Sequence, residues 1–596
     1  MRRTSAAAVA STITLAALAT FAGGVRAYAP GNPTVVSDVS SSADHYDATL
    51  PAPVQPNTQI EPSIAVNPGD PKDVVTAFQV GRVDAGGDAD NGFATSLDSG
   101  VTWRSGNLPG ATKLAPDCPN SALAGCALDR ASDAVVAFGK DPTGKAHGGY
   151  FVYVNSLVFD DTSQNALPSG MALNVSSDGG LTWTDATVIE QDNLAGLNDK
   201  NWIVADNGTG TGHHPGRLYM VWDRVVPVVY AYCDPDSTAS VTVGTGCDKL
   251  GNWSTANGNG FYVLFPGQGI GTMPVVLNNG DLGLIFNSET SNPCTAPQPP
   301  TDQPTCTTTV GVTQRIEWAA IPGAGSTVWP APFPATTFAP VTIATYMSNG
   351  VQYQRAGSLP QVAYDPTTGD AFVGWEDNRY RTDATPSSSN QNDAVIAVSS
   401  PAVAGTDPGL TWSAPIRVNQ DATNDHVDHW NTMLAVGADG ILRVGYRQRY
   451  EPDGMSPTAS GIDTYYQESR DQGQTFTTPL KVNTAVSSDP QFGAFSRNGL
   501  FLGDYQQLAA AGADETFVTR DESFAPSPGA SCNTGPFTTI PPAPCQNQET
   551  FVAHLVPSLT TATPESRFVP ALLVVAGVAG YGVYRRRRRL PPRSGS

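Results

Sequence analysis

The chain has 596 residues and a net charge of −21, with only 15% charged residues but 59 glycines and 49 prolines. We expect no nucleic-acid partner, because phosphate backbones bind basic surfaces. Abundant glycine and proline, together with the lack of long stretches of helical period, predict an all-β fold with many turns.

The two ends of the chain carry targeting patterns. Arg2 and Arg3 precede an alanine-rich apolar stretch, and small residues stand just before Tyr28, which predicts a signal peptide over residues 1–27. Residues 568–584 carry no charge and are followed by five arginines, which predicts a membrane helix and a basic cytoplasmic tail over 585–596. Residues 557–567 then form a short stalk. We therefore expect an exported protein, held in the cell membrane by one span with its main domain outside.

The eight cysteines fall into pairs that are close in sequence, and no Cys-x-x-Cys motif occurs. This spacing is typical of loops cross-linked outside the reducing cytosol rather than of metal sites. The predicted disulfides are Cys118–Cys126, Cys233–Cys247, Cys294–Cys306 and Cys532–Cys545.

One sequence pattern recurs between the two terminal segments. It consists of an alternating apolar strand, a turn rich in Asp, Asn, Gly or Pro, and a second strand. Its copies start at Pro62, Ser132, Asn201, Met273, Leu359, Trp430 and Leu500. The starts lie about 70 residues apart, enough for a four-stranded sheet with loops. We predict a single β-propeller over residues 58–556, seven-bladed, with six blades as the alternative. Residues 28–57 are predicted to supply a strand, near 32–39, that completes the last blade.

A second motif follows several of these hairpins. It reads SLDSGVTW (Ser96–Trp103), SSDGGLTW (Ser176–Trp183), DPGLTW (Asp407–Trp412) and SRDQGQTF (Ser469–Phe476). We expect a tight turn between the third and fourth strands, in which the Asp accepts amide hydrogen bonds and the Gly adopts a conformation that other residues resist. The aromatic residue is expected to pack between sheets. The residues concerned are Asp98, Gly100, Trp103, Asp178, Gly180, Trp183, Asp407, Gly409, Trp412, Asp471, Gly473 and Phe476.

This motif resembles the Asp-box, or bacterial neuraminidase repeat, of the sialidase superfamily. The resemblance implies a glycosidase site on the face away from the motif, with three arginines holding a sugar carboxylate and a tyrosine nucleophile activated by a glutamate. Loops on that face offer Arg224, Arg379 and Arg449 as the clamp, and Tyr505 or Tyr353 as the nucleophile. They also offer Glu61 or Glu376 as its partner, and Asp129 or Asp199 as the acid.

The family's Arg-Ile-Pro triplet is absent, and EPSIAV (Glu61–Val66) occupies the corresponding strand. An exo-α-sialidase acting on terminal acidic sugars and a non-catalytic propeller that binds glycans or glycoproteins therefore both stay open. We predict no metal site: the histidines of DHVDHW (Asp425–Trp430) are expected to hydrogen-bond backbone carbonyls. DADNG (Asp88–Gly92) faintly resembles a calcium loop but lacks the later glutamate, so calcium stays open as the alternative to a protein without a cofactor. No other cofactor and no oligomeric state is predicted.

Overall fold

The computed structural model describes the residues between 33 and 557 except for a set of loops. The described ranges are 33–42, 54–55, 57–114, 118, 125–160, 168–192, 198–224, 228–235, 246–254, 262–265, 269–289, 314–321, 341–345, 354–355, 359–382, 391–401, 411–450, 461–484, 488–496, 499–513, 515–525 and 546–557. Within this part of the chain, no helix is long and apolar enough to cross a membrane.

Several predictions concern residues outside these ranges. They are the signal peptide, the stalk, the membrane segment, the basic tail, Tyr353, Asp407, Gly409 and the pairs Cys294/Cys306 and Cys532/Cys545. Both remaining disulfides are confirmed: Cys118 is bonded to Cys126, and Cys233 to Cys247.

The described chain is all-β and its sheets are antiparallel units of four strands, apart from one small sheet. Unit 1 contains β2 (Gln59–Asn67), β3 (Asp70–Arg82), β4 (Asp88–Ser96) and β5 (Arg104–Asn107); unit 2 contains β6 (Arg130–Lys140), β7 (Tyr150–Phe159), β8 (Ser169–Ser176) and β9 (Thr187–Asp192). Unit 3 contains β10 (Asp199–Ala205), β11 (Leu218–Asp223), β12 (Val228–Cys233) and β13 (Tyr262–Phe265); unit 4 contains β14 (Gly269–Val276), β15 (Leu282–Glu289), β16 (Gln314–Ile321) and β17 (Val341–Thr345). Unit 5 contains β19 (Gln361–Asp365), β20 (Asp370–Asp377), β21 (Asp393–Ser399) and β22 (Ile416–Arg417); unit 6 contains β23 (Val427–Val436), β24 (Leu442–Tyr450), β25 (Asp463–Ser469) and β26 (Leu480–Lys481). Unit 7 contains β29 (Gln507–Ala511), β30 (Glu515–Ser523), β31 (Gln548–Val556) and β1 (Thr34–Ser40).

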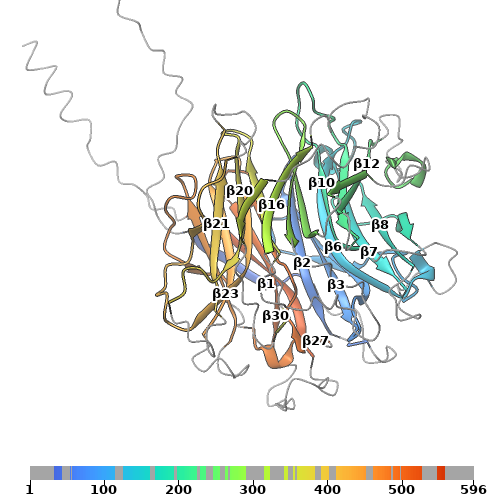
Figure 1. Ribbon diagram of the computed structural model, residues 1–596. Coiled ribbons are helices and arrows are strands. Elements are labelled where there is room, and N and C mark those ends of the chain that lie inside the picture. The colour runs from blue at the N-terminus through green and yellow to red at the C-terminus, as the bar shows by residue number, and fades with distance from the viewer. Residues whose placement is uncertain are drawn as a thin grey trace, which may run out of the picture. The chain divides into compact units, whose positions relative to one another are not determined.

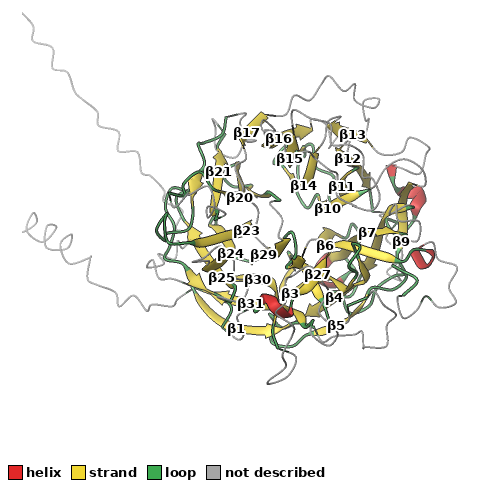
Figure 2. Ribbon diagram, turned by 60° about the horizontal axis from the view of Figure 1, so that its bottom comes forward, coloured by secondary structure: helices red, strands yellow, loops and turns green. Residues whose placement is uncertain are grey.

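The first strands of the units contact one another in a closed order. β2 contacts β6, β6 contacts β10, β10 contacts β14, and the series continues through β19, β23 and β29 back to β2. Figure 2 shows the sheets arranged around a common centre, with β6, β10, β14, β23 and β29 innermost. Units 1 and 2 are also joined by one bridge, between Asp88 and Ala131.

The seventh hairpin differs from its predicted position at Leu500. That residue belongs to β28 (Gly499–Phe501), which pairs with β27 (Ala494–Ser496) and, in parallel, with β18 (Gln354–Arg355). Gly503 follows with a φ of 81°, so the chain turns before the inner strand β29 begins at Gln507. The sequence pattern had joined two separate strands into one.

Unit 7 contains both ends of the described chain. β1 pairs antiparallel with β31 from Thr34 opposite Val556 to Ser40 opposite Phe551, so blue β1 lies with the late strands in Figure 1. The buried guanidinium of Arg520 on β30 donates hydrogen bonds to Asp38 of β1 and, at 2.6 Å, to Glu522. Asp38 also accepts a hydrogen bond from the Thr484 amide at 2.6 Å.

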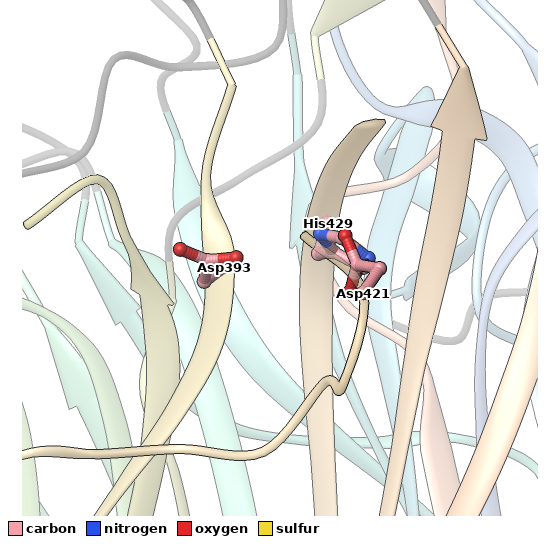
Figure 3. Close-up of side chains that lie close together, drawn as sticks. All are labelled: Asp393, Asp421 and His429. Carbon is pink, nitrogen blue, oxygen red and sulfur yellow. Dashed lines mark ion pairs between the residues drawn. The ribbon is translucent and has the colours of Figure 1, made fainter. Parts of the chain in front are cut away.

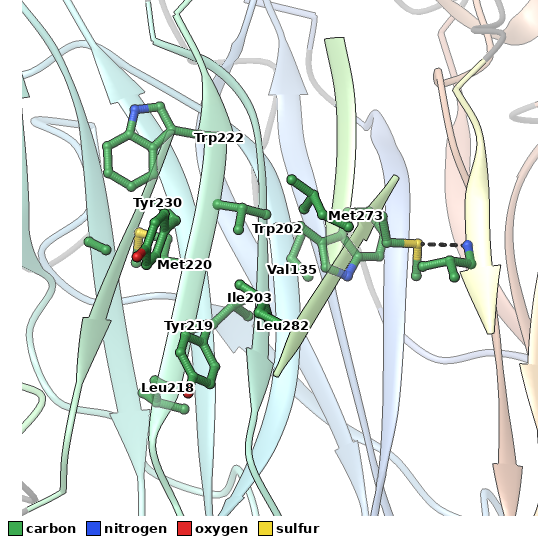
Figure 4. Packing of buried hydrophobic residues seen from close by; sticks show 14 of the residues in the cluster. Val135, Trp202, Ile203, Leu218, Tyr219, Met220, Trp222, Tyr230, Met273 and Leu282 are labelled. Atoms are coloured by element: carbon green, nitrogen blue, oxygen red, sulfur yellow. Dashed lines mark hydrogen bonds between the residues drawn. The ribbon is translucent and has the colours of Figure 1, made fainter. Parts of the chain in front are cut away.

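The largest hydrophobic cluster extends between neighbouring units. Figure 4 shows part of it, where Val135 of unit 2, Trp202 and Ile203 of unit 3, and Leu282 of unit 4 lie close together. Within it, the Val362 amide of unit 5 contacts the Met273 sulfur of unit 4 at 3.4 Å. The units are therefore held together by burial of the apolar faces that their alternating strands present.

The repeated octapeptide forms the same turn wherever it is described. In the first copy, Asp98 accepts hydrogen bonds from the Thr102 amide at 2.8 Å and the Thr102 hydroxyl at 2.6 Å, and Ser96 accepts one from the Gly100 amide at 2.8 Å. The copies at Asp178 and Asp471 repeat these bonds. The hydroxyl of Thr102 is the main reason that the pKa of Asp98 is lowered.

The aromatic residue of each copy packs against the preceding unit. Trp183 of unit 2 lies 5.4 Å from Phe93 of unit 1, and Trp412 of unit 5 lies 5.5 Å from Trp318 of unit 4, between ring centroids. Phe476 of unit 6 packs on a cluster shared by units 5 and 6, and Trp103 of unit 1 packs on one shared by units 1 and 7. The octapeptide thus links adjacent sheets.

We predict that Gly473→Ala is more destabilising than Gly144→Ala. Both glycines have positive φ, 82° and 67°, so both substitutions incur the left-handed cost of about 1–2 kcal/mol. A Cβ at Gly473 would lie 2.6 Å from Ile396 Cδ1 of the neighbouring unit, whereas one at Gly144 meets nothing within 4 Å. Urea unfolding should show an additional loss of about 1–3 kcal/mol for Gly473→Ala; equal losses would contradict the inter-unit contact.

We predict that Asp38→Ala lowers the free energy of unfolding by about 3–5 kcal/mol, because it leaves the buried Arg520 charge short of a partner. Val36→Ala, a change on the same strand at a side chain that is 52% exposed, is the control and should cost about 0.5 kcal/mol or less. Similar losses for the two variants, measured by urea unfolding at pH 7, would show that the ion pair does not hold β1 in place.

Candidate functional site

The turns inside the hairpins and the octapeptide turns share one face of the structure. The Ser99 amide donates to the Lys72 carbonyl at 3.0 Å, and the His147 amide donates to the Ser177 carbonyl at 2.9 Å. The opposite ends of the inner strands therefore form a separate face. That face carries the candidate functional residues.

Five of the inner strands contain a residue of irregular backbone conformation near that face. The register of the hairpin shifts there in units 1, 2, 3, 4 and 6, and a residue with positive φ stands at each shift. These residues are Glu61, Asp133, Lys200, Gly271 and Asn431, with φ values of 52°, 46°, 35°, 75° and 51°. Four of them are not glycine, and strained conformations of this kind cluster at functional sites.

The bulges of neighbouring units are hydrogen-bonded to each other. Asn201 of unit 3 donates to the Asp133 carbonyl of unit 2 at 2.9 Å, and Asn431 of unit 6 donates to the Gly503 carbonyl before unit 7 at 3.4 Å. At these two places, a side chain of one unit therefore helps to hold the backbone of its neighbour.

Three side chains from two units meet at the centre of this face. The ammonium group of Lys200 lies 3.5 Å from the ring centroid of Tyr505 and 4.6 Å from that of Trp202. The two rings are 5.6 Å apart in an edge-on arrangement. The Lys200 nitrogen is buried and, among the described residues, has no hydrogen-bond partner. Its charge is stabilised by the aromatic faces and by nearby carboxylates.

Glu61 lies in the same cluster and is 3% exposed. It accepts hydrogen bonds from the Asp504 amide at 2.6 Å and from the Gln79 side chain. Burial raises the pKa of Glu61 well above its usual range, the negative charges of Asp504 and Asp133 raise it further, and Lys200 opposes them. Burial also lowers the pKa of Lys200, although Asp133 and Glu61 offset this effect.

Tyr505, the predicted nucleophile, is 2% exposed. Its burial raises the pKa of the phenol well above its usual range, and the charges of Asp133 and Glu61 raise it further. The structure therefore brings together the predicted Tyr505 and Glu61, and adds Lys200 and Asp133. We call Glu61, Asp133, Lys200 and Tyr505 the central cluster.

The sequence patterns gave Asp133 and Lys200 no role. A signal was present for Lys200, which directly precedes its copy of the repeated hairpin as Glu61 does; Asp133 stands one residue after the start of its copy. The bulges that turn these side chains to one centre are not visible in the sequence pattern.

The predicted acids lie elsewhere or only at the edge of the central cluster. Asp129 precedes β6 and pairs with Lys113 at 3.4 Å and Arg130 at 3.3 Å. Asp199 begins β10, accepts a hydrogen bond from the Lys200 amide at 2.9 Å, and contributes to the electrostatics of Lys200. Glu376, the alternative partner, is buried in β20 of unit 5.

Two of the predicted arginines interact with nearby carboxylates, Arg379 within its own unit and Arg224 with Glu190 of unit 2. Arg379 donates two hydrogen bonds to Asp377, at 2.8 Å from Nε and 2.6 Å from Nη2. Arg224 follows β11; burial lowers its pKa, and the charge of Glu190 offsets this.

Arg449 is buried in β24 opposite Asp428. The neighbouring Arg447 donates to Asp521 of unit 7 at 2.6 Å.

The faint calcium-loop segment is part of β4 in unit 1. Its Asp88 is buried and pairs with Arg82 at 3.1 Å, and burial raises its pKa to about 7, an effect that Arg82 opposes. Asn107 donates to Asp90 at 3.2 Å. These carboxylates are thus engaged by side chains of their own sheet.

No protein-family model matches the chain, and no curated protein matches it. Solved structures with a similar fold include a protein of unknown function from Dyadobacter fermentans, 12% identical, covering 89% of this chain and 100% of that one, with a TM-score of 0.38. An α-L-arabinanase of Penicillium chrysogenum is 11% identical, covering 88% and 99%, with a TM-score of 0.38. An intramolecular trans-sialidase of Ruminococcus gnavus is 13% identical, covering 68% and 92%, with a TM-score of 0.37. Likenesses this distant provide no residue-level correspondence.

We predict that Lys200→Met destabilises the protein more at pH 8 than at pH 5. Because the pKa of Glu61 is raised by folding, its ionisation reduces stability as the pH rises above the usual value of 4.5. Loss of the Lys200 charge raises that pKa further. The free energy of unfolding should then fall with pH by about 1.4 kcal/mol more for every tenfold change in the acid dissociation constant of Glu61.

Urea unfolding at the two pH values measures this difference. Lys113→Met is the control, because Lys113 is 42% exposed and its pair with Asp129 should contribute about 1 kcal/mol or less at either pH. A loss for Lys200→Met that is the same at pH 5 and pH 8 would contradict the coupling with Glu61.

Proposed function

We propose that the chain is a glycoside hydrolase of propeller type whose reaction centre is the central cluster. The single observation that carries this proposal is that Tyr505, just before β29, meets Glu61, Asp133 and Lys200 of the inner strands β2, β6 and β10. We further propose that the seven units are the blades of one propeller, which the pairing of β1 with β31 closes.

In the proposed reaction, the Tyr505 hydroxyl attacks the anomeric carbon of a terminal sugar and its proton passes to the Glu61 carboxylate. The bond to the leaving oxygen breaks, and Asp133 supplies the proton that this oxygen needs. Water then attacks the anomeric carbon and gives its proton to Asp133, while Glu61 returns its proton to the departing Tyr505 oxygen, so all three residues are restored. The raised pKa of Glu61 supports its role as base, since a carboxylate of higher pKa accepts a proton from a phenol more readily.

A phenol with a raised pKa does not ionise unaided near neutral pH, so the nucleophile needs the adjacent base. The base must itself be deprotonated, and turnover should therefore rise with pH through the raised pKa of Glu61. Lys200 helps to keep Glu61 ionised. The scheme requires no cofactor, calcium included.

For the substrate we propose the terminal acidic sugars of glycans or glycoproteins, released in the manner of an exo-α-sialidase. The proposal rests on the resemblance of the octapeptide and on the arginines near this face. The engagement of Arg379 by Asp377 favours the second candidate, a propeller that binds glycan or protein without turnover. From the sequence patterns alone we propose that the protein is exported and anchored at the cell surface.

The test is turnover of fluorogenic glycosides by the purified full chain, beginning with an α-sialoside. We predict that Tyr505→Phe lowers turnover by about 10³-fold or more, because it removes the nucleophilic oxygen and keeps the ring that packs on Lys200 and Trp202. Tyr446→Phe is the matched control: Tyr446 is also buried, but its hydroxyl donates to Gln467 within unit 6. It should retain turnover.

Turnover that Tyr505→Phe leaves unchanged would disprove the assignment of the nucleophile. A folded parent that turns over no glycoside but binds on a glycan array would establish the binding module instead. Arg379→Ala then distinguishes acidic from neutral substrates. It should weaken the binding of an acidic sugar and leave the binding of a neutral sugar unchanged.

A further inference from the structure

A second polar cluster lies between units 5 and 6, apart from the central cluster. Asp393 begins β21, Asp421 follows β22, and His429 lies on β23. One carboxylate oxygen of each aspartate and one ring nitrogen of the histidine all lie within 4.8 Å of one another, and Figure 3 shows the His429 ring beside Asp421. Asp393 and His429 are fully buried.

The histidine presents a free lone pair to this cluster. Its Nδ1 donates to the Asn392 carbonyl at 3.0 Å, as the sequence led us to expect, and this bond fixes the neutral tautomer with a bare Nε2. Nε2 has no hydrogen-bond donor among the described residues, although Asp421 Oδ1 lies only 3.4 Å away. Two acceptors facing each other this closely need a positive group between or beside them.

The two aspartates also have buried oxygen atoms that lack a hydrogen-bond donor in the part of the chain that the structure describes. The Oδ1 atoms of Asp393 and Asp421 each accept a hydrogen bond from Asn419, at 2.8 and 2.7 Å, and Asp393 Oδ1 accepts another from Arg417. The Oδ2 atom of each aspartate is buried without a donor in the described chain. Three acceptor atoms are therefore left, and a single water has only two hydrogens to offer them.

The guanidinium groups around the cluster do not balance its charge. Arg417 and Arg381 lie within 4.0 Å of the two aspartates, but Arg381 also pairs with Asp425 at 3.1 Å. Three carboxylates thus face two guanidinium groups. This leaves a net negative charge in a largely buried place, which is costly unless a cation is bound.

We propose that Asp393, Asp421 and His429 bind one divalent transition-metal cation of the zinc class. An imidazole nitrogen with two carboxylates suits zinc or its first-row neighbours, whereas calcium and magnesium prefer oxygen ligands alone. The hydrogen bond from Nδ1 to a backbone carbonyl is the usual support of a ligating histidine. The cation would link Asp393 and Asp421 of unit 5 to His429 of unit 6, so its role is to stabilise the contact between these two sheets.

The experiment uses the full chain, purified without a polyhistidine tag, stripped with EDTA and dialysed against Zn²⁺, Mn²⁺, Ca²⁺ or Mg²⁺. We expect elemental analysis to find about one retained zinc per chain, and Zn²⁺ to raise the Tm by about 2 °C or more where Ca²⁺ and Mg²⁺ do not. His429→Gln and Asp421→Asn should lose both effects. His213→Gln is the control, because both ring nitrogens of His213 already have partners, Asp206 at 2.8 Å and the Asn278 carbonyl at 2.9 Å.

A parent that retains no zinc and shows no rise in Tm would overturn the proposal, and so would equal zinc retention by parent and His429→Gln. Stabilisation by Ca²⁺ in place of Zn²⁺ would overturn the choice of metal. Should His429→Gln fail to fold, Asp421→Asn decides the matter, since Asp421 lies in a loop and its side chain is 22% exposed. After cobalt substitution, the parent should show visible absorption, and Asp421→Asn should not.

Discussion

The extra left-handed residue near one end of the inner strands is the constraint on which the candidate site depends. Each such residue moves the strand out of register, and without it every following side chain would point to the opposite face of the sheet. Four of the five are not glycine, so the backbone incurs about 1–2 kcal/mol at each. The apolar packing between units and the hydrogen bonds between bulges offset this cost. Glu61, Asp133 and Lys200 reach one centre because the strands are bent there.

The octapeptide has the complementary role at the opposite ends of the strands. Its Ser, Asp and Thr satisfy the turn's own hydrogen bonds, so the turn forms from local sequence. Its aromatic residue then packs on the preceding sheet. A motif that looks purely local therefore sets the spacing between neighbouring units, and it leaves the other face free to vary.

The sequence predicted what depends on neighbours along the chain: the all-β class, the hairpins, the octapeptide turns and the disulfides Cys118–Cys126 and Cys233–Cys247. It also grouped Tyr505 with Glu61, through resemblance. It did not predict the part of Lys200 or Asp133, because a bulge arises from packing against the next unit. Nor did it predict that Arg379 would be held by Asp377, or that Gly503 would separate β28 from β29. Those outcomes depend on φ angles and on contacts between distant residues.

The pairing of β1 with β31 has a consequence for biosynthesis. Among the described strands β1 emerges from the ribosome first, and all the other described strands must follow before its partner β31 is complete. During that interval its edge is open, and Val36 and Val39 are side chains that could recruit another strand. Folding is therefore limited by the latest contact in the sequence rather than by any single unit. A nascent chain that stalled before residue 548 would contain every other sheet but would lack β31, the strand that pairs with β1.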